Sequence, residues 1–216
     1  MQTCAILEPE KESTSKEERP MKKVLILSGS PRKDGNSDLL CSEFMRGAQE
    51  SGNEVQKIFV RSKKIVPCNA CYYCRDHGGK CALNDDMSEI LDAMQAADVI
   101  VMASPVYFYS IDAQMKIIID RSLARWTNIP NKEFYFIMTC ADDNRAAMAC
   151  TLECFRGFTA CLNGAKEKGG HLRHRRISAR RGDVLPGHEG SLRDGQKRLI
   201  SQFYIKECNG YEQFSV

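Results

Sequence analysis

Four cysteines fall within one short stretch of the chain, CNACYYCRDHGGKC. Two residues separate Cys68 from Cys71 and Cys71 from Cys74, and Cys81 follows after six more. Three thiolates at the first spacing can occupy three corners of a cuboidal iron–sulfur cluster, and a fourth thiolate from a short excursion can close the last corner. The paired glycines of the stretch provide the turn that such an excursion needs. The spacing therefore predicts a metal centre, and a four-iron, four-sulfur cluster fits it best.

Two other interpretations of this cysteine loop, residues 68–81, remain open. Zinc is usually held by two well-separated cysteine pairs, so it fits the spacing less well. The thiols can also be packed side chains without a ligand, and His77 fits a solvated turn residue better than a metal ligand. The cysteines outside the loop show no ligand spacing and are interpreted as small buried or surface residues: Cys4, Cys41, Cys140, Cys150, Cys154, Cys161 and Cys208.

A second stretch, SGSPRKDGNS, has the composition of an anion-binding turn. Its small residues allow a tight backbone turn, and we expect a helix to begin near its end, so that helical N–H groups point at the same spot. The stretch is neither a Walker loop nor a GxGxxG fingerprint. Its candidate ligand residues are four side chains that can donate hydrogen bonds and one cation: Ser28, Ser30, Asn36 and Ser37, with Arg32.

A third stretch, SPVYFYS, follows a run of apolar residues. We expect Pro105 to stop the hydrogen-bond ladder of a strand. Tyr107 and Phe108 would then lie at the strand end beside the anion-binding turn, where they could contact a flat ring system. Aromatic residues at strand ends are more often part of the core, so this signal gains weight only from its pairing with the turn.

The elements that must position these stretches follow from apolar periodicity. Apolar runs predict strands at 24–28, 55–60, 98–104 and 134–139, and helical spacing predicts helices over 39–48, 87–94, 111–123 and 148–162. Asp86 and Glu89 are placed to cap the second of these helices, and Arg121 and Trp126 are interpreted as packing or pairing residues. This strand–helix alternation predicts an α/β fold, a doubly wound parallel sheet that binds ligands at the carboxyl ends of its strands.

Composition limits the class of protein. The chain has 216 residues, of which 43% are hydrophobic, and a net charge of +3. These values fit one domain with a sizeable core. Residues 1–20 lack the apolar core of a signal peptide, and no stretch approaches the roughly 20 apolar residues of a membrane helix. We expect a cytoplasmic protein without a membrane partner, whose eleven cysteines stay reduced.

Five motifs, in this order, carry a resemblance to a known family: KVLILSGSPRKDGN, PCNACYYC, KCALNDDM, ASPVYF and AQMKIIIDR. The sequence resembles the flavodoxin-like NAD(P)H-dependent FMN reductases, and in particular their iron–sulfur flavoproteins, over residues 21–169. The resemblance implies a five-stranded flavodoxin-like sheet. It also implies that the FMN phosphate is held within the anion-binding turn, by Ser30, Arg32, Asn36 and Ser37. The isoalloxazine ring would lie against the third stretch, at Pro105, Val106, Tyr107 and Phe108.

The same resemblance implies further partners. It implies a 4Fe–4S cluster on the four thiols of the cysteine loop, NAD(P)H or ferredoxin as electron donor, and a small-molecule acceptor. Similar proteins are oligomers in which the cysteine loop packs near a neighbouring subunit's flavin, so we expect a homo-oligomer. Two alternative functions remain: a cluster-free FMN or quinone reductase, and a protein that uses a zinc-stapled loop and a basic tail to hold nucleic acid.

Three segments are expected along the chain. Residues 1–20 read as a disordered polar extension, 21–169 as the FMN-binding domain, and 170–216 as an aberrant basic tail. The tail has no apolar periodicity and carries five arginines between Arg173 and Arg181, where the family would place its fifth strand, a glycine turn and a final helix. One interpretation is a basic arm for nucleic acid. We prefer the hypothesis that it is out of frame, because a one-base shift with free codon choice restores such elements; we expect no nucleic-acid partner.

Overall fold

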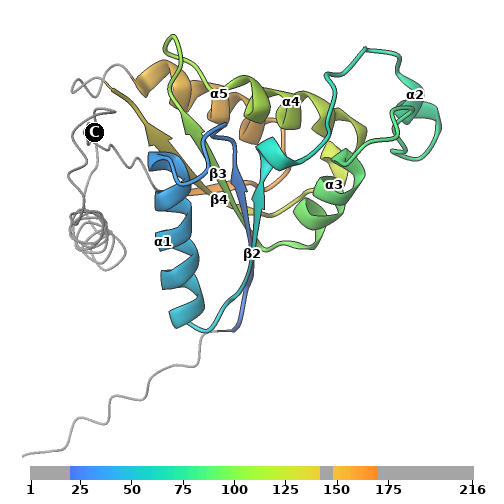
Figure 1. The fold of residues 1–216 in the computed structure, drawn as a ribbon. Coiled ribbons are helices and arrows are strands. Elements are labelled where there is room, and N and C mark those ends of the chain that lie inside the picture. The colour runs from blue at the N-terminus through green and yellow to red at the C-terminus, as the bar shows by residue number, and fades with distance from the viewer. Residues whose placement is uncertain (1–19, 142–147, 170–216) are drawn as a thin grey trace, which may run out of the picture.

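The computed structural model describes residues 20–141 and 148–169, which build a five-stranded sheet with helices on both faces (Figure 1). Its strands are β1 (Lys23–Ser28), β2 (Glu54–Phe59), β3 (Val99–Pro105), β4 (Glu133–Thr139) and β5 (Lys166–Gly169). They lie in the order β2-β1-β3-β4-β5, and each neighbouring pair is parallel. This is the flavodoxin-like order, so the predicted doubly wound α/β fold is confirmed.

The strands are connected by α-helices and by short 3₁₀ helices. The α-helices are α1 (Asn36–Glu50), α2 (Tyr73–Asp76), α3 (Met87–Ala96), α4 (Ala113–Arg121) and α5 (Ala149–Ala160). Three short 3₁₀ helices are η1 (Val60–Ser62), η2 (Ser122–Ala124) and η3 (Trp126–Asn128). In Figure 1, α1 lies across the sheet from α3 and α4. The cysteine loop, which contains α2, extends away from the sheet between η1 and α3.

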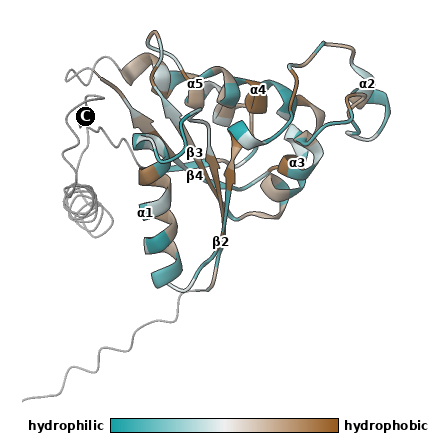
Figure 2. Cartoon of the chain, viewed as in Figure 1, coloured by the Kyte–Doolittle hydropathy of each residue, from teal (hydrophilic) through white to brown (hydrophobic). Residues whose placement is uncertain are grey.

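Two buried clusters hold the layers together, one on each face of the sheet. Helix α1 packs Leu40 and Phe44 against one face, whereas α3, α4 and α5 pack against the other through residues such as Met94, Met115 and Phe155. All seven residues of β3 are buried, as expected for a central parallel strand covered on both faces. Figure 2 shows hydrophobic residues, in brown, along the central strands and hydrophilic residues, in teal, on α1.

The structure places Pro105 where the ladder was expected to stop. Pro105 is the last residue of β3, and it pairs with Thr139 of β4. The Val106 N–H donates to the Thr139 carbonyl oxygen at 2.8 Å. Neighbouring residues of a strand point their N–H groups to opposite sides, so Pro105 has no N–H to donate on the side of β1, where the pairing of β1 with β3 ends at Ser28 and Ala103. The expectation that this proline stops the ladder is therefore confirmed.

Two expectations were wrong in detail. The side chain of Asp86 does not cap α3: it accepts a hydrogen bond from the chain that leads into the cysteine loop, and Glu89 pairs with Lys63 at 2.6 Å. Asp85 takes the capping role instead, since its Oδ1 accepts the Met87 N–H at 3.2 Å. The fifth strand lies at Lys166–Gly169, before the arginine-rich segment in which the family resemblance would place it.

The proposed extension at 1–20 and tail at 170–216 lie outside the described residues, except for Pro20. Within the described ranges, no helix combines the length and the apolar composition that crossing a membrane requires.

Candidate functional site

The anion-binding turn lies between β1 and α1, and its backbone is held tightly against β3. The Gly29 N–H donates to the Ala103 carbonyl oxygen at 2.8 Å. A Cβ atom at Gly29 would lie 2.8 Å from that oxygen and 2.8 Å from Asp112 Oδ2. Only glycine allows two segments of the chain to approach so closely without pushing either of them aside. The turn therefore starts from a fixed point on the carboxyl edge of the sheet.

Helix α1 presents a free N-terminus to the turn. Gly35 is its N-cap residue and has no side chain, so no side chain caps the first turn of the helix. The first N–H groups of an α-helix have no partner within the helix and attract anions. Ser30 is buried, Asn36 is half-buried, and Arg32 is exposed beside them. This arrangement fits a phosphate group.

A buried carboxylate beside the turn is neutralised by a lysine. Asp38 accepts hydrogen bonds from the Ser28 hydroxyl at 3.1 Å and from the Asp34 N–H at 3.0 Å, and Lys57 of β2 pairs with it at 2.6 Å. Burial raises the pKa of Asp38, but the hydrogen bonds and charge of these partners lower it by more, so the pKa lies below its usual value. Because Lys57 balances the negative charge, Asp38 leaves the positive potential of the helix end available to an anion.

Thr139, at the end of β4, joins the anion-binding turn to the aromatic stretch. Its hydroxyl lies 2.7 Å from the Ser37 hydroxyl, within hydrogen-bond distance, and its carbonyl oxygen accepts the Val106 N–H at 2.8 Å. The expected ligand residues at the ends of β1 and β3 are thus connected through a single residue of a third strand. Sequence analysis missed Thr139, although its place at the end of a strand pattern was a usable signal.

The aromatic stretch forms a tight, strained turn. Tyr107 and Ser110 exchange two backbone hydrogen bonds of 3.0 Å, and the two residues between them, Phe108 and Tyr109, have φ angles of 49° and 60°. Positive φ at both central positions is the geometry of a type I′ turn, which favours asparagine and glycine over bulky residues. The Phe108 side chain is fully exposed. Strained, exposed aromatic residues of this kind are typical of ligand-binding segments.

Asp112 is a buried acid directly beneath the anion-binding turn. It is 1% exposed and caps α4 by accepting the Met115 N–H at 2.8 Å, and the Ser104 hydroxyl donates to its other oxygen at 2.9 Å. Burial raises the pKa of Asp112 to about 6, although these hydrogen bonds oppose the rise. Sequence analysis did not single it out, because its burial follows from the packing of Ser104 and of the turn at Gly29 against it.

The cysteine loop presents its four thiols at the surface. Cys68 and Cys71 are exposed, and Cys74 and Cys81 are half-buried. Among the described residues, no three or more Cys, His, Asp or Glu side chains are placed to hold one metal ion, so the loop does not gather these thiols in this conformation. Four accessible thiols are nevertheless a donor set that suits iron–sulfur chemistry. His77 stacks on Tyr73 with ring centroids 3.6 Å apart, in agreement with a turn residue.

The neck of the loop is closed by a buried arginine. Nη1 of Arg121 donates to the Val66 carbonyl oxygen at 2.6 Å and to Asp85 Oδ2 at 2.7 Å, and Nη2 donates to Asp85 Oδ1 at 2.9 Å. Asp85 Oδ2 also accepts the Val66 N–H at 3.1 Å. Burial raises the pKa of Asp85, but its hydrogen bonds lower it below the usual value. Arg121 thus pairs as expected from the sequence, and it joins the two ends of the loop.

A further contact fixes the far side of the loop to the body of the protein. Gly79 has a φ of 82°, and a Cβ atom there would lie 2.8 Å from the Ala124 carbonyl oxygen. Glycine is favoured for both reasons, since the left-handed conformation strains residues that carry a side chain and the close approach leaves no room for one. The cysteine loop therefore meets the body of the protein both at its neck and at η2.

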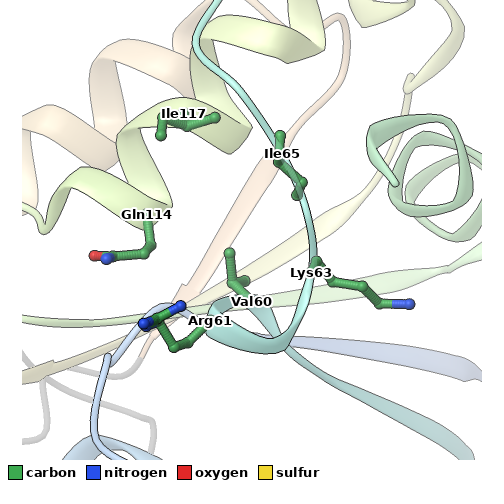
Figure 3. Close-up of a pocket in the computed structure, with 6 residues that line it drawn as sticks. All are labelled: Val60, Arg61, Lys63, Ile65, Gln114 and Ile117. Carbon is green, nitrogen blue, oxygen red and sulfur yellow. The ribbon is translucent and has the colours of Figure 1, made fainter. Parts of the chain in front are cut away.

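A small pocket of about 160 Å³ lies between η1 and α4 (Figure 3). Apolar side chains of the two segments face one another across it, with polar ends at its margin; its lining is Val60, Arg61, Lys63, Ile65, Gln114 and Ile117. None of the predicted FMN or cluster residues belongs to this lining. Ligand sites for drug-sized molecules usually measure about 300–1,000 Å³, so this pocket is too small to be a cofactor site by itself.

Comparison with known proteins assigns this chain to a family. The family model for NADPH-dependent FMN reductase matches residues 22–153. An iron–sulfur flavoprotein of Methanocaldococcus jannaschii is 44% identical over 100 residues, which cover 46% of this chain and 51% of that protein. One from Methanosarcina thermophila is 41% identical over 101 residues, covering 47% and 52%. The chain therefore matches about half the length of these curated relatives.

Solved structures agree with the fold. An NAD(P)H:quinone oxidoreductase from Methanothermobacter marburgensis is similar with a TM-score of 0.60, 13% identity, and coverage of 91% of this chain and 100% of that one. An FMN-dependent NADH-azoreductase from Bacillus anthracis, in complex with FMN, gives 0.55 at 14% identity, covering 84% and 99%. At these identities the likeness concerns the fold alone. Because the family model matches more than half of the chain, the protein belongs to the NADPH-dependent FMN reductase family, and its similar relatives include iron–sulfur flavoproteins.

Proposed function

We propose that this protein is an FMN-dependent oxidoreductase that passes electrons from NAD(P)H or ferredoxin to a small acceptor, with a 4Fe–4S cluster as its second redox centre. One observation carries the proposal: an uncapped helix N-terminus and a strained aromatic turn lie at the ends of the adjacent strands β1 and β3. FMN has an anionic phosphate and a flat ring system, so one ligand suits both features.

The chain's own residues would bind and orient FMN. The N–H groups at the start of α1, with Ser30, Arg32, Asn36 and Ser37, would hold the phosphate through charge-assisted hydrogen bonds. The turn from Pro105 to Phe108 would support the ring.

The cysteine loop would supply the second centre. Cys68, Cys71, Cys74 and Cys81 would bind the cluster as thiolates, and binding would have to draw the loop together from its described conformation. When bound, FMN accepts two electrons and can release them singly, whereas a cluster carries one, so together they would couple two-electron donors to one-electron carriers. The four cysteines of the loop form no disulfide in the described structure, and we propose a reducing, cytoplasmic location.

The separation of the two regions favours an oligomer. The aromatic turn lies just before the start of α4, and the neck of the cysteine loop contacts the last residue of the same helix. The nine residues of α4 span roughly 13 Å. Within one subunit the two regions are therefore held apart by a rigid helix. A second subunit could bring its own loop to the flavin region, and we propose a homo-oligomer for this reason.

The test is chemical analysis of anaerobically purified protein. We expect flavin absorption with a broad iron–sulfur shoulder, and about four iron and four sulfide per chain. The variant Cys71→Ser should lose iron and keep FMN, because the proposed flavin residues are not in the loop. Flavin bands without iron in the parent would contradict the cluster and favour a cluster-free FMN or quinone reductase. Zinc without flavin would contradict the whole proposal in favour of a nucleic-acid-binding protein.

A further inference from the structure

The guanidinium of Arg121 reaches beyond the neck of the cysteine loop to one of its thiols. Nη2 of Arg121 lies 3.5 Å from Cys81 Sγ, a hydrogen-bond distance for a sulfur acceptor. An arginine keeps its proton at every pH a protein tolerates, so the donor is permanent. Because Asp85 holds the same guanidinium through both of its oxygens, the direction of the N–H group toward the sulfur is fixed.

Burying the charge of Arg121 costs folding free energy that a purely structural contact would not require. The Arg121 side chain is 1% exposed, and its Nε is buried without a hydrogen-bond partner among the described residues. Burying a charged group that is incompletely paired costs free energy, and apolar residues can often replace a buried ion pair without loss of stability. Closing the neck does not by itself explain why a full positive charge lies next to a thiol.

We propose that Arg121 is a positioning residue for the cluster, which holds Cys81 at the neck and donates a charge-assisted hydrogen bond to its sulfur. The inference rests on the proposed cluster. An electron added to a cluster increases the negative charge on its ligand sulfurs, so a cationic donor stabilises the reduced form more than the oxidised form. Arg121 therefore raises the reduction potential of the cluster, and it does so from outside the set of ligands.

The test compares Arg121→Lys and Arg121→Gln with the parent, each reconstituted anaerobically with iron and sulfide. The midpoint potential is measured by redox titration with dithionite, followed by the EPR signal of the reduced cluster; dithionite supplies one electron and no bond is broken. Lysine keeps the charge but cannot bind Asp85 through a fork and also donate to Cys81. We expect its reduction equilibrium constant to fall about tenfold, which is about 59 mV for one electron, and that of Arg121→Gln to fall further.

Arg125→Gln is the matched control. Arg125 follows η2, and its guanidinium pairs with Asp92 and hydrogen-bonds to Gln95 of helix α3. Only its aliphatic stem, which glutamine largely keeps, lies near Gly79 of the cysteine loop. Its loss should leave the potential of the cluster unchanged. Normal iron content with an unchanged potential in both Arg121 variants would overturn the role of Arg121 and leave the cluster standing. Absence of iron from the reconstituted parent would overturn the cluster, and the role of Arg121 with it.

A second measurement needs no substitution at Arg121, in case the variants do not fold. The parent is labelled with ¹⁵N-arginine, and pulsed EPR of the reduced cluster is used to detect coupling to a guanidinium nitrogen. We expect a ¹⁵N coupling that persists in Arg75→Lys, since Arg75 is the arginine within the cysteine loop itself and lies over the Tyr72 ring. A reduced cluster without such coupling, or a coupling that disappears with Arg75, would overturn the inference.

Discussion

Replacing Gly29 by alanine should destabilise the protein and weaken its hold on FMN. The added Cβ would lie 2.8 Å from the Ala103 carbonyl oxygen and 2.8 Å from Asp112 Oδ2, well inside the ordinary contact distance of about 3.5–4.0 Å. Neither neighbour is a flexible side-chain end, because one is strand backbone and the other is the buried cap of α4. The turn must therefore move away from β3, and overpacking of this kind costs about 1–3 kcal/mol.

Gly47→Ala is the matched control for this prediction. Gly47 lies in α1, where an added Cβ would meet no atom within 4 Å, so the same substitution should raise stability by about 0.5–1 kcal/mol. Urea denaturation measures both free energies of unfolding, and fluorescence titration measures FMN affinity. For a chain of this size each kcal/mol corresponds to roughly 2–4 °C in melting temperature.

Only Gly29→Ala should also lose FMN affinity, because Gly29 starts the turn that we propose for the phosphate. A Gly29→Ala variant as stable as the parent, with unchanged FMN affinity, would refute the argument from close approach.

Three further predictions follow from the site. Arg32→Ala and Asn36→Ala should each weaken FMN binding at least tenfold, since each removes a hydrogen bond to phosphate worth roughly 1.5–3 kcal/mol; unchanged affinity in both would mean that the phosphate binds elsewhere. Burial raises the pKa of Asp112 to about 6 in the folded protein, from an ordinary value near 3.8, so its protonated form stabilises the fold. The parent should therefore lose stability relative to Asp112→Asn as pH rises from 4 to 7. Parallel pH profiles of the two proteins in urea denaturation would contradict this. The lowered pKa values of Asp38 and Asp85 act in the opposite sense toward low pH, which is why the difference between parent and variant is the quantity to measure. Light scattering of the flavin-bound protein should report an oligomer, and a stable monomer would count against the proposed partner subunit.

Local patterns in the sequence determined much of the architecture. The run from Val99 to Ser104 is apolar throughout because β3 is covered on both faces, and the helical spacing of Met87, Ile90 and Met94 follows from the one face that α3 buries. These signals depend only on neighbours along the chain, so they can be read without knowing the sheet order. The same holds for the turns at strand ends, which a parallel sheet necessarily brings to one edge.

Tertiary structure decided which of these pieces meet. Thr139 reaches Ser37 across 102 residues, and Arg121 reaches Cys81 across 40, only because the order β2-β1-β3-β4-β5 brings their elements together. The partners of Pro105 likewise depend on strand order, since it pairs with Thr139 of β4 while the pairing of β1 with β3 has stopped at Ser28. Strand order and register result from the packing of the whole sheet, and no local periodicity carries that information. For this reason the sequence determined the elements and the residues with suitable chemistry, and only the packed sheet decided their partners.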